Sequence, residues 1–255
     1  MTLTEFYQQK AGVALMWMGN AGWVINLHGV IFCTDLDLHS PERVPLPQNV
    51  DIEELARRIQ IAFVTHEHGD HFNEDTSRML AERSACRFVI PASCVQTAEE
   101  IRLPKDRVTV VAPGNDYAMA GLSVRTVRAI HGHFAGSVFS GANVSDCGYV
   151  FERRGFRIYQ PGDTVLLEEH FDMRDIDAAF VSPTEHNMHV ENAARYLSLL
   201  APRYTLPQHY DSYAVTAENA FWTRGFVDEL YDRLPEERRA GFIRVSQGRP
   251  VALLE

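Results

Sequence analysis

Four side chains of the kind that bind metal ions lie within six residues, and no other feature of this chain constrains its fold as tightly. They are His66, His68, Asp70 and His71, in the sequence H-E-H-G-D-H. The apolar run Ile59 to Thr65 predicts a buried strand directly before them, and a helix is expected over Glu74 to Arg83. In extended backbone, side chains two residues apart point the same way, so His66 and His68 should converge. Imidazole and carboxylate ligands suit zinc, and also iron, nickel or manganese.

Strands and helices are interspersed along the rest of the 255 residues. Helical patterns cover Ile52 to Arg58, Glu74 to Arg83, Val190 to Leu200 and Thr216 to Leu234. Strand patterns cover Cys86 to Ile90, Val108 to Val111, Ile176 to Val181, Tyr204 to Pro207, Phe242 to Val245 and Val251 to Leu254, with antiparallel ribbons over Tyr117 to Ile130 and Tyr149 to Tyr159. This order favours one domain over residues 1–255, an α/β sandwich of sheets covered by helices.

The apolar stretch Ala11 to Cys33 is long enough to span a membrane. However, Asn20, Asn26 and His28 interrupt it, and turn signals occur at Gly19-Asn20 and at His28-Gly29. We therefore predict two or three short buried strands here and no contact with a membrane.

The charge and the cysteine content indicate which partners this chain can bind and in which cellular compartment it belongs. The net charge is −10 and no run of Lys and Arg occurs, which opposes nucleic-acid binding. The four cysteines form no C-x-x-C pair, and the chain starts without a basic, secretory-type segment. These features predict a cytoplasmic protein with reduced thiols.

The chain resembles the metallo-β-lactamase superfamily, whose signature H-x-H-x-D-H is matched at His66 to His71. Further segments resemble the family's opening strands, its strand-then-Gly-Asp motif and its last histidine: Met18 to Gly22, Val30 to Asp35, Tyr159 to Thr164 and Leu206 to Asp211. Within the superfamily the chain is most similar to the ascorbate-6-phosphate lactonase-like branch of metal-dependent hydrolases. The resemblance implies a four-layer αββα sandwich.

The resemblance also implies two divalent ions, most simply Zn²⁺, with Mn²⁺ or Fe²⁺ as alternatives. One ion takes His66, His68 and a third histidine, the other takes Asp70, His71 and His209, and Asp163 bridges them. The third histidine is either His131 or His133. His131 directly ends the alternating strand Val124 to Ile130, so its direction is better defined. His133 is then expected either to line the pocket or to be solvated.

Several other residues are candidates for supporting roles near this site. His186 and His189 follow a strand and are predicted to donate a proton or to bind substrate. Asp35, Tyr210 and Asp211 are predicted to support metal ligands from behind. The small-residue segment Gly132–Gly148 is predicted to form a loop over the site.

We therefore expect a hydrolase that uses a metal-bridging hydroxide on an ester-type bond, such as a lactone or a phosphodiester of a small molecule. Asp70 is expected to orient the hydroxide and to pass a proton toward the leaving group. A non-hydrolytic metal-binding protein or a di-iron redox protein of the same fold is the alternative. Substrate identity and oligomeric state stay open, because one fold hosts many chemistries.

Overall fold

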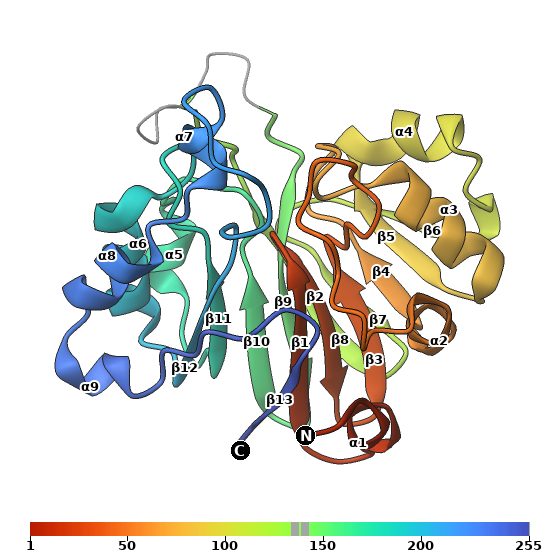
Figure 1. Cartoon of the computed structure of the whole chain (residues 1–255), viewed down its shortest axis with the longest axis horizontal. Coiled ribbons are helices and arrows are strands. Elements are labelled where there is room, and N and C mark those ends of the chain that lie inside the picture. The colour runs from red at the N-terminus through yellow and green to blue at the C-terminus, as the bar shows by residue number, and fades with distance from the viewer. Residues whose placement is uncertain (134–137, 139–142, 255) are drawn as a thin grey trace.

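Two β-sheets pack face to face between two outer layers of helices in the computed structural model, which describes residues 1–133, 138 and 143–254 (Figure 1). Apolar side chains of both sheets fill the space between them, and separate apolar clusters lie under each helical layer. The αββα sandwich predicted for this chain is therefore confirmed. The predicted loop Gly132–Gly148 falls in large part outside the described residues.

The first sheet has seven strands, of which six come from residues 13–111 and one from the C-terminal end of the chain. In spatial order they are β13 (Pro250–Leu253), β1 (Val13–Gly19), β2 (Gly22–Leu27), β3 (Val30–Thr34), β4 (Ile61–Phe63), β5 (Arg87–Pro91) and β6 (Val108–Val111). The chain turns at Asn20 and His28, both in the left-handed backbone region. The stretch from residue 11 to residue 33 is thus three buried strands, as its turn signals predicted.

The second sheet has six strands. In spatial order they are β12 (Tyr204–Pro207), β11 (Ala178–Val181), β10 (Phe156–Gln160), β9 (Cys147–Arg153), β8 (Leu122–Arg128) and β7 (Asp116–Met119). The strands β10, β11 and β12 are parallel, whereas β7 to β10 form antiparallel pairs. The predicted antiparallel ribbons are confirmed.

The packing of β1 shows why the long apolar run from residue 11 to residue 33 forms strands. Its alternate residues Val13, Leu15 and Trp17 face the second sheet, whereas Ala14 and Met16 lie under the helices. Both faces of the strand are buried, so both sets of alternating positions must be apolar.

The helices lie outside the sheets and are short. They are α1 (Leu3–Gln8), α2 (Ile52–Arg58), α3 (Glu74–Arg83), α4 (Val95–Glu100), α5 (Glu169–Asp172), α6 (His189–Leu200), α7 (Ala220–Thr223), α8 (Val227–Arg233) and α9 (Glu236–Arg239), with 3₁₀ turns at Ala92–Cys94 and Lys105–Arg107. Residues of α1 to α4 join the apolar cluster outside the first sheet, and residues of α6 and α8 join that outside the second. None of the described helices combines the length and apolar character needed to cross a bilayer.

Two sequence predictions of secondary structure were wrong. The expected helix Thr216 to Leu234 is broken into α7 and α8 around Gly225, where a Cβ atom would lie 2.7 Å from the carbonyl oxygen of His209. The backbone at Gly225 must approach the end of β12 closely, and a continuous helix would prevent this approach. The expected strand Phe242 to Val245 makes only one isolated bridge, from Phe242 to Thr205, before it leaves the sheet.

The strands that precede the predicted ligands end at one edge of the sandwich, the upper edge in Figure 1. Strand β4 leads to His66, β8 leads to His131, β10 leads to Asp163 and β12 leads to His209. The carboxyl ends of similarly directed strands meet at the same edge, which is where α/β folds place their ligands. The topology therefore brings residues more than 140 positions apart to one place.

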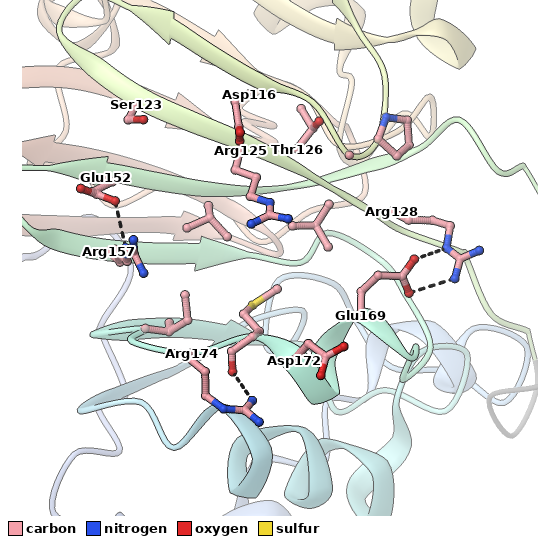
Figure 2. A pocket seen from close by; sticks show the side chains of 16 residues that line it. Asp116, Ser123, Arg125, Thr126, Arg128, Glu152, Arg157, Glu169, Asp172 and Arg174 are labelled. Carbon is pink, nitrogen blue, oxygen red and sulfur yellow. Dashed lines mark hydrogen bonds and ion pairs between the residues drawn. The ribbon is translucent and has the colours of Figure 1, made fainter.

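A groove of 860 Å³ lies elsewhere, against β8, β9 and β10 on the outer face of the second sheet (Figure 2). Among the charged side chains that line it, Arg128 pairs with Glu169 and Arg157 pairs with Glu152. None of the predicted metal ligands lines this groove.

Candidate metal centre

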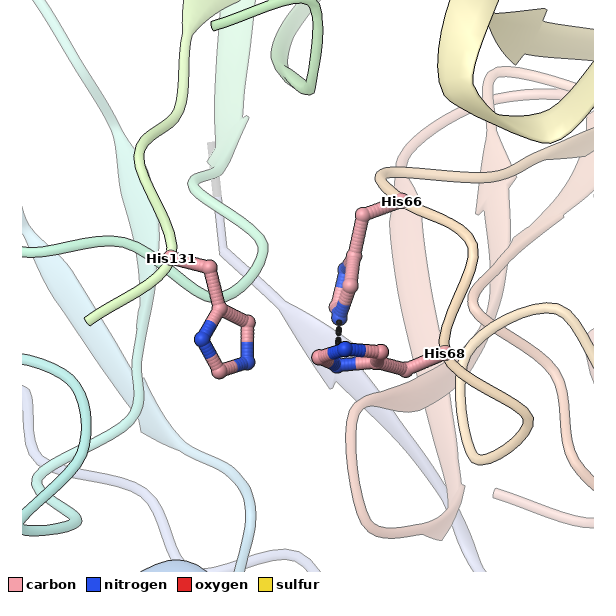
Figure 3. Close-up of side chains that lie close together, drawn as sticks. All are labelled: His66, His68 and His131. Carbon is pink, nitrogen blue, oxygen red and sulfur yellow. Dashed lines mark hydrogen bonds between the residues drawn. The ribbon is translucent and has the colours of Figure 1, made fainter. Parts of the chain in front are cut away.

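The loop after β4 brings His66 and His68 together, as predicted, although β4 ends at Phe63 and His66 lies in a bend and not in extended backbone. Nε2 of His66 lies 3.0 Å from Nδ1 of His68, although His66 is buried and His68 is exposed. His131 faces this pair from the end of β8, with its ring centroid 4.6 Å from that of His68 (Figure 3). One donor atom from each of these three residues lies within 4.8 Å of the others.

Among the residues that the structure describes, His133, the alternative third histidine, belongs to none of the groups that could hold a metal ion. Its ring centroid lies 6.0 Å from that of Phe221, next to α7. The geometry therefore places His131 with the first pair and places His133 beside an aromatic side chain.

A second group consists of Asp70, His71 and His209. The Nε2 atoms of His71 and His209 lie 3.4 Å apart, and each lies 3.6 Å from Oδ2 of Asp70. Donors placed about 2.1 Å from a tetrahedral ion are about 3.4 Å from one another. The three donors thus already have the spacing that a zinc-sized ion requires.

Asp163 lies between the two groups and is buried. Its Oδ2 is 3.2 Å from Nε2 of His209 and 3.5 Å from Nε2 of His131, and its Oδ1 is 3.6 Å from Nε2 of His71. Within the described part of the chain, this buried Oδ1 atom has no hydrogen-bond partner. A buried carboxylate oxygen without a partner is costly, and a bound cation would remove that cost.

His186 joins the cluster, because it forms a further group of metal-type donors with His131 and Asp163, whereas His189 does not join it. Nε2 of His186 lies 2.7 Å from Oδ2 of Asp163, and its backbone N–H donates to the carbonyl oxygen of Phe221. His189 belongs to none of the metal-type groups formed by the described residues, and its ring packs on Phe226 with centroids 5.6 Å apart. The predicted role of His189 in catalysis thus stays a prediction.

Asp35 supports the second group from behind, as predicted. Its Oδ2 lies 3.0 Å from Nδ1 of His71, and the backbone N–H of Thr65 donates to its Oδ1 (2.8 Å). The carboxylate therefore fixes the ring of His71 with Nε2 toward the cluster.

The same prediction does not hold for Tyr210 and Asp211. The ring of Tyr210 stacks on Trp17 in the core at 4.7 Å, and Asp211 is exposed to solvent. His209 and Asp211 both adopt left-handed backbone conformations, so the chain turns sharply after β12. The side chains of Tyr210 and Asp211 therefore point away from the metal-type cluster.

Asn20 contacts the site, although its sequence context indicated only a turn. Its side-chain amide donates to Oδ2 of Asp70 (2.8 Å), and its carbonyl oxygen accepts the backbone N–H of His209 (3.0 Å). The only signal was its place in Met18 to Gly22, directly after a strand that ends at the same edge.

Burial and neighbouring charges shift the pKa values of the cluster in opposite directions. Burial lowers the pKa of His66 well below its ordinary value, and the neighbouring His71 lowers it further. Burial alone would raise the pKa of Asp163, but His209, His71 and His186 outweigh burial and hold it well below its usual range. A neutral imidazole and an ionised carboxylate are the protonation states that bind metal ions.

Comparison with known proteins finds relatives in sequence and in fold. A UPF0173 metal-dependent hydrolase of Hyperthermus butylicus is 23% identical over 218 residues, which cover 84% of this chain and 90% of that protein. Similar folds occur in Igni18, a metallo hydrolase from Ignicoccus hospitalis (TM-score 0.73, 18% identity, 95% of this chain and 99% of that one), and in isothiocyanate hydrolase from Delia radicum gut bacteria (TM-score 0.68, 18% identity, 94% and 99%).

The fold also occurs in CmlA, a diiron β-hydroxylase from Streptomyces venezuelae (TM-score 0.71, 14% identity, 95% of this chain and 54% of that one). The sandwich itself therefore does not select one chemistry. The family model of the beta-lactamase superfamily domain matches residues 33–210, which include all seven predicted metal ligands. With two sheets, covering helices and histidine and aspartate side chains positioned to bind metal, the chain belongs to the metallo-β-lactamase superfamily.

Proposed function

We propose that this protein is a metal-dependent hydrolase that cleaves an ester-type bond of a small molecule, a lactone or a phosphodiester, with two divalent ions. One observation carries the proposal: Asp163 lies between two groups of three donors, which are His66, His68 and His131 in one and Asp70, His71 and His209 in the other. Zn²⁺ fits the imidazole-rich donor set best, and Mn²⁺ or Fe²⁺ are the alternatives. Relatives named metal-dependent hydrolases support the same activity.

Two bound ions would supply Lewis acidity, which activates water near neutral pH and polarises the bond to be cleaved. Asp70 is the proposed proton carrier. Its Oδ2 faces His71 and His209, so Oδ1 is left to accept a proton from the attacking water and return it to the leaving group.

His186 has a different proposed role. Its Nε2 contacts Oδ2 of Asp163, and its Nδ1 lies 3.2 Å from the carbonyl oxygen of Phe221. The ring thus lies between Asp163 and the backbone of Phe221, and we assign it the task of orienting Asp163 between the two groups.

The exposure of the cluster indicates where substrate approaches. The side chains of His71, Asp163 and His209 are at most 2% exposed, whereas those of Asp70 and His131 are 21% and 23% exposed. Substrate therefore has to enter from the side that carries Asp70, His131 and the exposed His68.

The decisive experiment measures turnover of lactones, phosphodiesters and thioesters by metal-depleted protein, before and after addition of zinc, manganese or iron. His66→Ala and Asp70→Ala should reduce turnover at least 100-fold, because the loss of a single catalytic group costs about 10²–10⁴-fold. His28→Asn is the control, since this turn residue lies at the opposite ends of the strands and asparagine tolerates its left-handed backbone.

Elemental analysis of the same samples should give two ions per chain. A ceiling of one ion in excess metal would contradict the two-ion site. Metal-dependent oxygen consumption without hydrolysis of any ester-type substrate would instead favour the di-iron redox alternative.

A further inference from the structure

We propose that Asn20 is a positioning residue that holds Asp70 and His209 in place and thereby sets the affinity for the ion bound by Asp70, His71 and His209. The inference rests on the proposed function, because it requires that these residues bind metal. It assigns a role to a residue of the turn between β1 and β2, far from every predicted ligand in the sequence.

Asn20 contacts two ligands of one group through two different atoms. Its side-chain Nδ2 donates to Oδ2 of Asp70 at 2.8 Å, and Oδ2 is the oxygen that faces His71 and His209. Its carbonyl oxygen accepts the backbone N–H of His209 at 3.0 Å. A single residue thus connects the loop after β4 with the end of β12.

Asn20 is itself held firmly, which a positioning residue requires. It is 3% exposed, its backbone N–H contacts Oγ of Ser212, and Nε1 of Trp17 donates to its carbonyl oxygen (2.9 Å). Its φ of 48° is a left-handed conformation, which asparagine adopts more readily than most other residues. The turn therefore delivers the amide to Asp70 from a fixed backbone.

The amide of Asn20 also orients the carboxylate of Asp70. Donation from Nδ2 occupies one lone pair of Oδ2 and stops the carboxylate from rotating, so the remaining lone pair faces the ion site. Loss of such a supporting hydrogen bond typically lowers metal affinity about 10- to 100-fold. A residue needed only for the turn would have no such effect.

The test compares metal binding by Asn20→Gly, Asn20→Asp and the wild type. Glycine keeps the left-handed turn without the amide, and aspartate keeps the shape but replaces the donor with an acceptor. Titration of metal-free protein with Co²⁺, followed by its visible absorption, should show binding of one ion weakened at least 10-fold in both variants and the other ion unchanged.

Asn26→Gly is the matched control. Asn26 is another buried asparagine of the same sheet, but its amide donates to the carbonyl oxygens of Phe6 and Gln9. This variant should lower the unfolding temperature and keep both affinities for Co²⁺.

Wild-type affinity for both ions in Asn20→Gly and Asn20→Asp would overturn the inference and leave the proposed function intact. A wild-type protein that takes up no second ion would instead overturn the two-ion function, and with it the role of Asn20.

Discussion

Oδ2 of Asp35 lies 3.0 Å from Nδ1 of His71, and neither side chain has any exposed surface. Thr65 holds the same carboxylate, since its backbone N–H donates to Oδ1 and its hydroxyl to Oδ2, both at 2.8 Å. The carboxylate accepts the proton on Nδ1 of His71, so Nε2 is the nitrogen that faces the cluster. A residue directly after β3 thus determines the orientation of a histidine in the loop after β4.

This pair predicts a pH dependence of metal binding. Burial alone would lower the pKa of His71, but Asp163, Asp70 and Asp35 outweigh it and raise the pKa well above its ordinary value. Metal-free protein should therefore carry a proton on Nε2 at neutral pH, and an incoming ion must displace it. Metal affinity should rise with pH through the neutral range. Calorimetric titration in buffers of different ionisation enthalpy counts the protons released.

Asp35→Asn should release fewer protons and bind metal about 10-fold more weakly, because it removes both a charge and the fixed orientation of His71. Asp37→Asn is the control, a buried carboxylate nearby that should leave proton release unchanged. Its hydrogen bonds go to Tyr213, His39 and Ser40. Equal proton release by Asp35→Asn and the wild type would contradict the role of this pair.

A second prediction distinguishes His131 from His133. His131→Ala should lower the affinity for one ion by about 10-fold or more, since even supporting residues contribute that much. His133→Ala should keep both ions and change only substrate affinity or rate, because its ring packs on Phe221. Parallel metal titrations decide the matter, and loss of an ion in the His133 variant alone would reverse the assignment.

A third prediction concerns the close approach of two backbone segments. A Cβ atom at Gly132 would lie 2.0 Å from the carbonyl oxygen of His186, so an alanine must push these segments apart. Gly132→Ala should destabilise the protein by about 1–3 kcal/mol and weaken metal binding, because the segments carry His131 and His186.

Gly69→Ala serves as its control inside the metal-binding loop. A Cβ atom there would meet no described atom within 4 Å, and the residue is not among the glycines with positive φ. Thermal unfolding should distinguish the two variants. Equal destabilisation of both would show that the contact with His186 is not the cause.

A fourth prediction concerns His170, which is buried beneath α6 and lies outside the cluster. Burial lowers its pKa to about 4, and its Nδ1 accepts the backbone N–H of Leu167. Between pH 6.5 and 4 the unfolded chain binds a proton here that the folded chain does not, so stability falls as pH falls. This difference amounts to about 3 kcal/mol at 1.36 kcal/mol per pH unit.

His170→Gln should therefore flatten the decline in unfolding free energy between pH 6.5 and 4, whatever its stability at neutral pH. Denaturant unfolding of both proteins at several pH values measures the two slopes. Parallel slopes would mean that other groups cause the acid destabilisation.

The local sequence alone determined that His66, His68, Asp70 and His71 lie in one short loop between a buried strand and a helix, because the apolar pattern fixes where the strand ends and the helix begins. How His71 and Asp70 are oriented within that loop depends on the distant residues Asp35 and Asn20. The three opening strands were predictable for a similar reason, because Asn20 and His28 occupy turns between apolar runs that are buried on both faces.

Only the tertiary structure decided which distant residues meet that loop. His186 joins the cluster and His189 does not, although both follow the same strand, because Phe221 holds the backbone of His186. Asn20 reaches Asp70 only because β1 ends at the same edge as β4. These contacts depend on how two sheets and a broken helix pack together, and spacing within one segment carries no information about that packing.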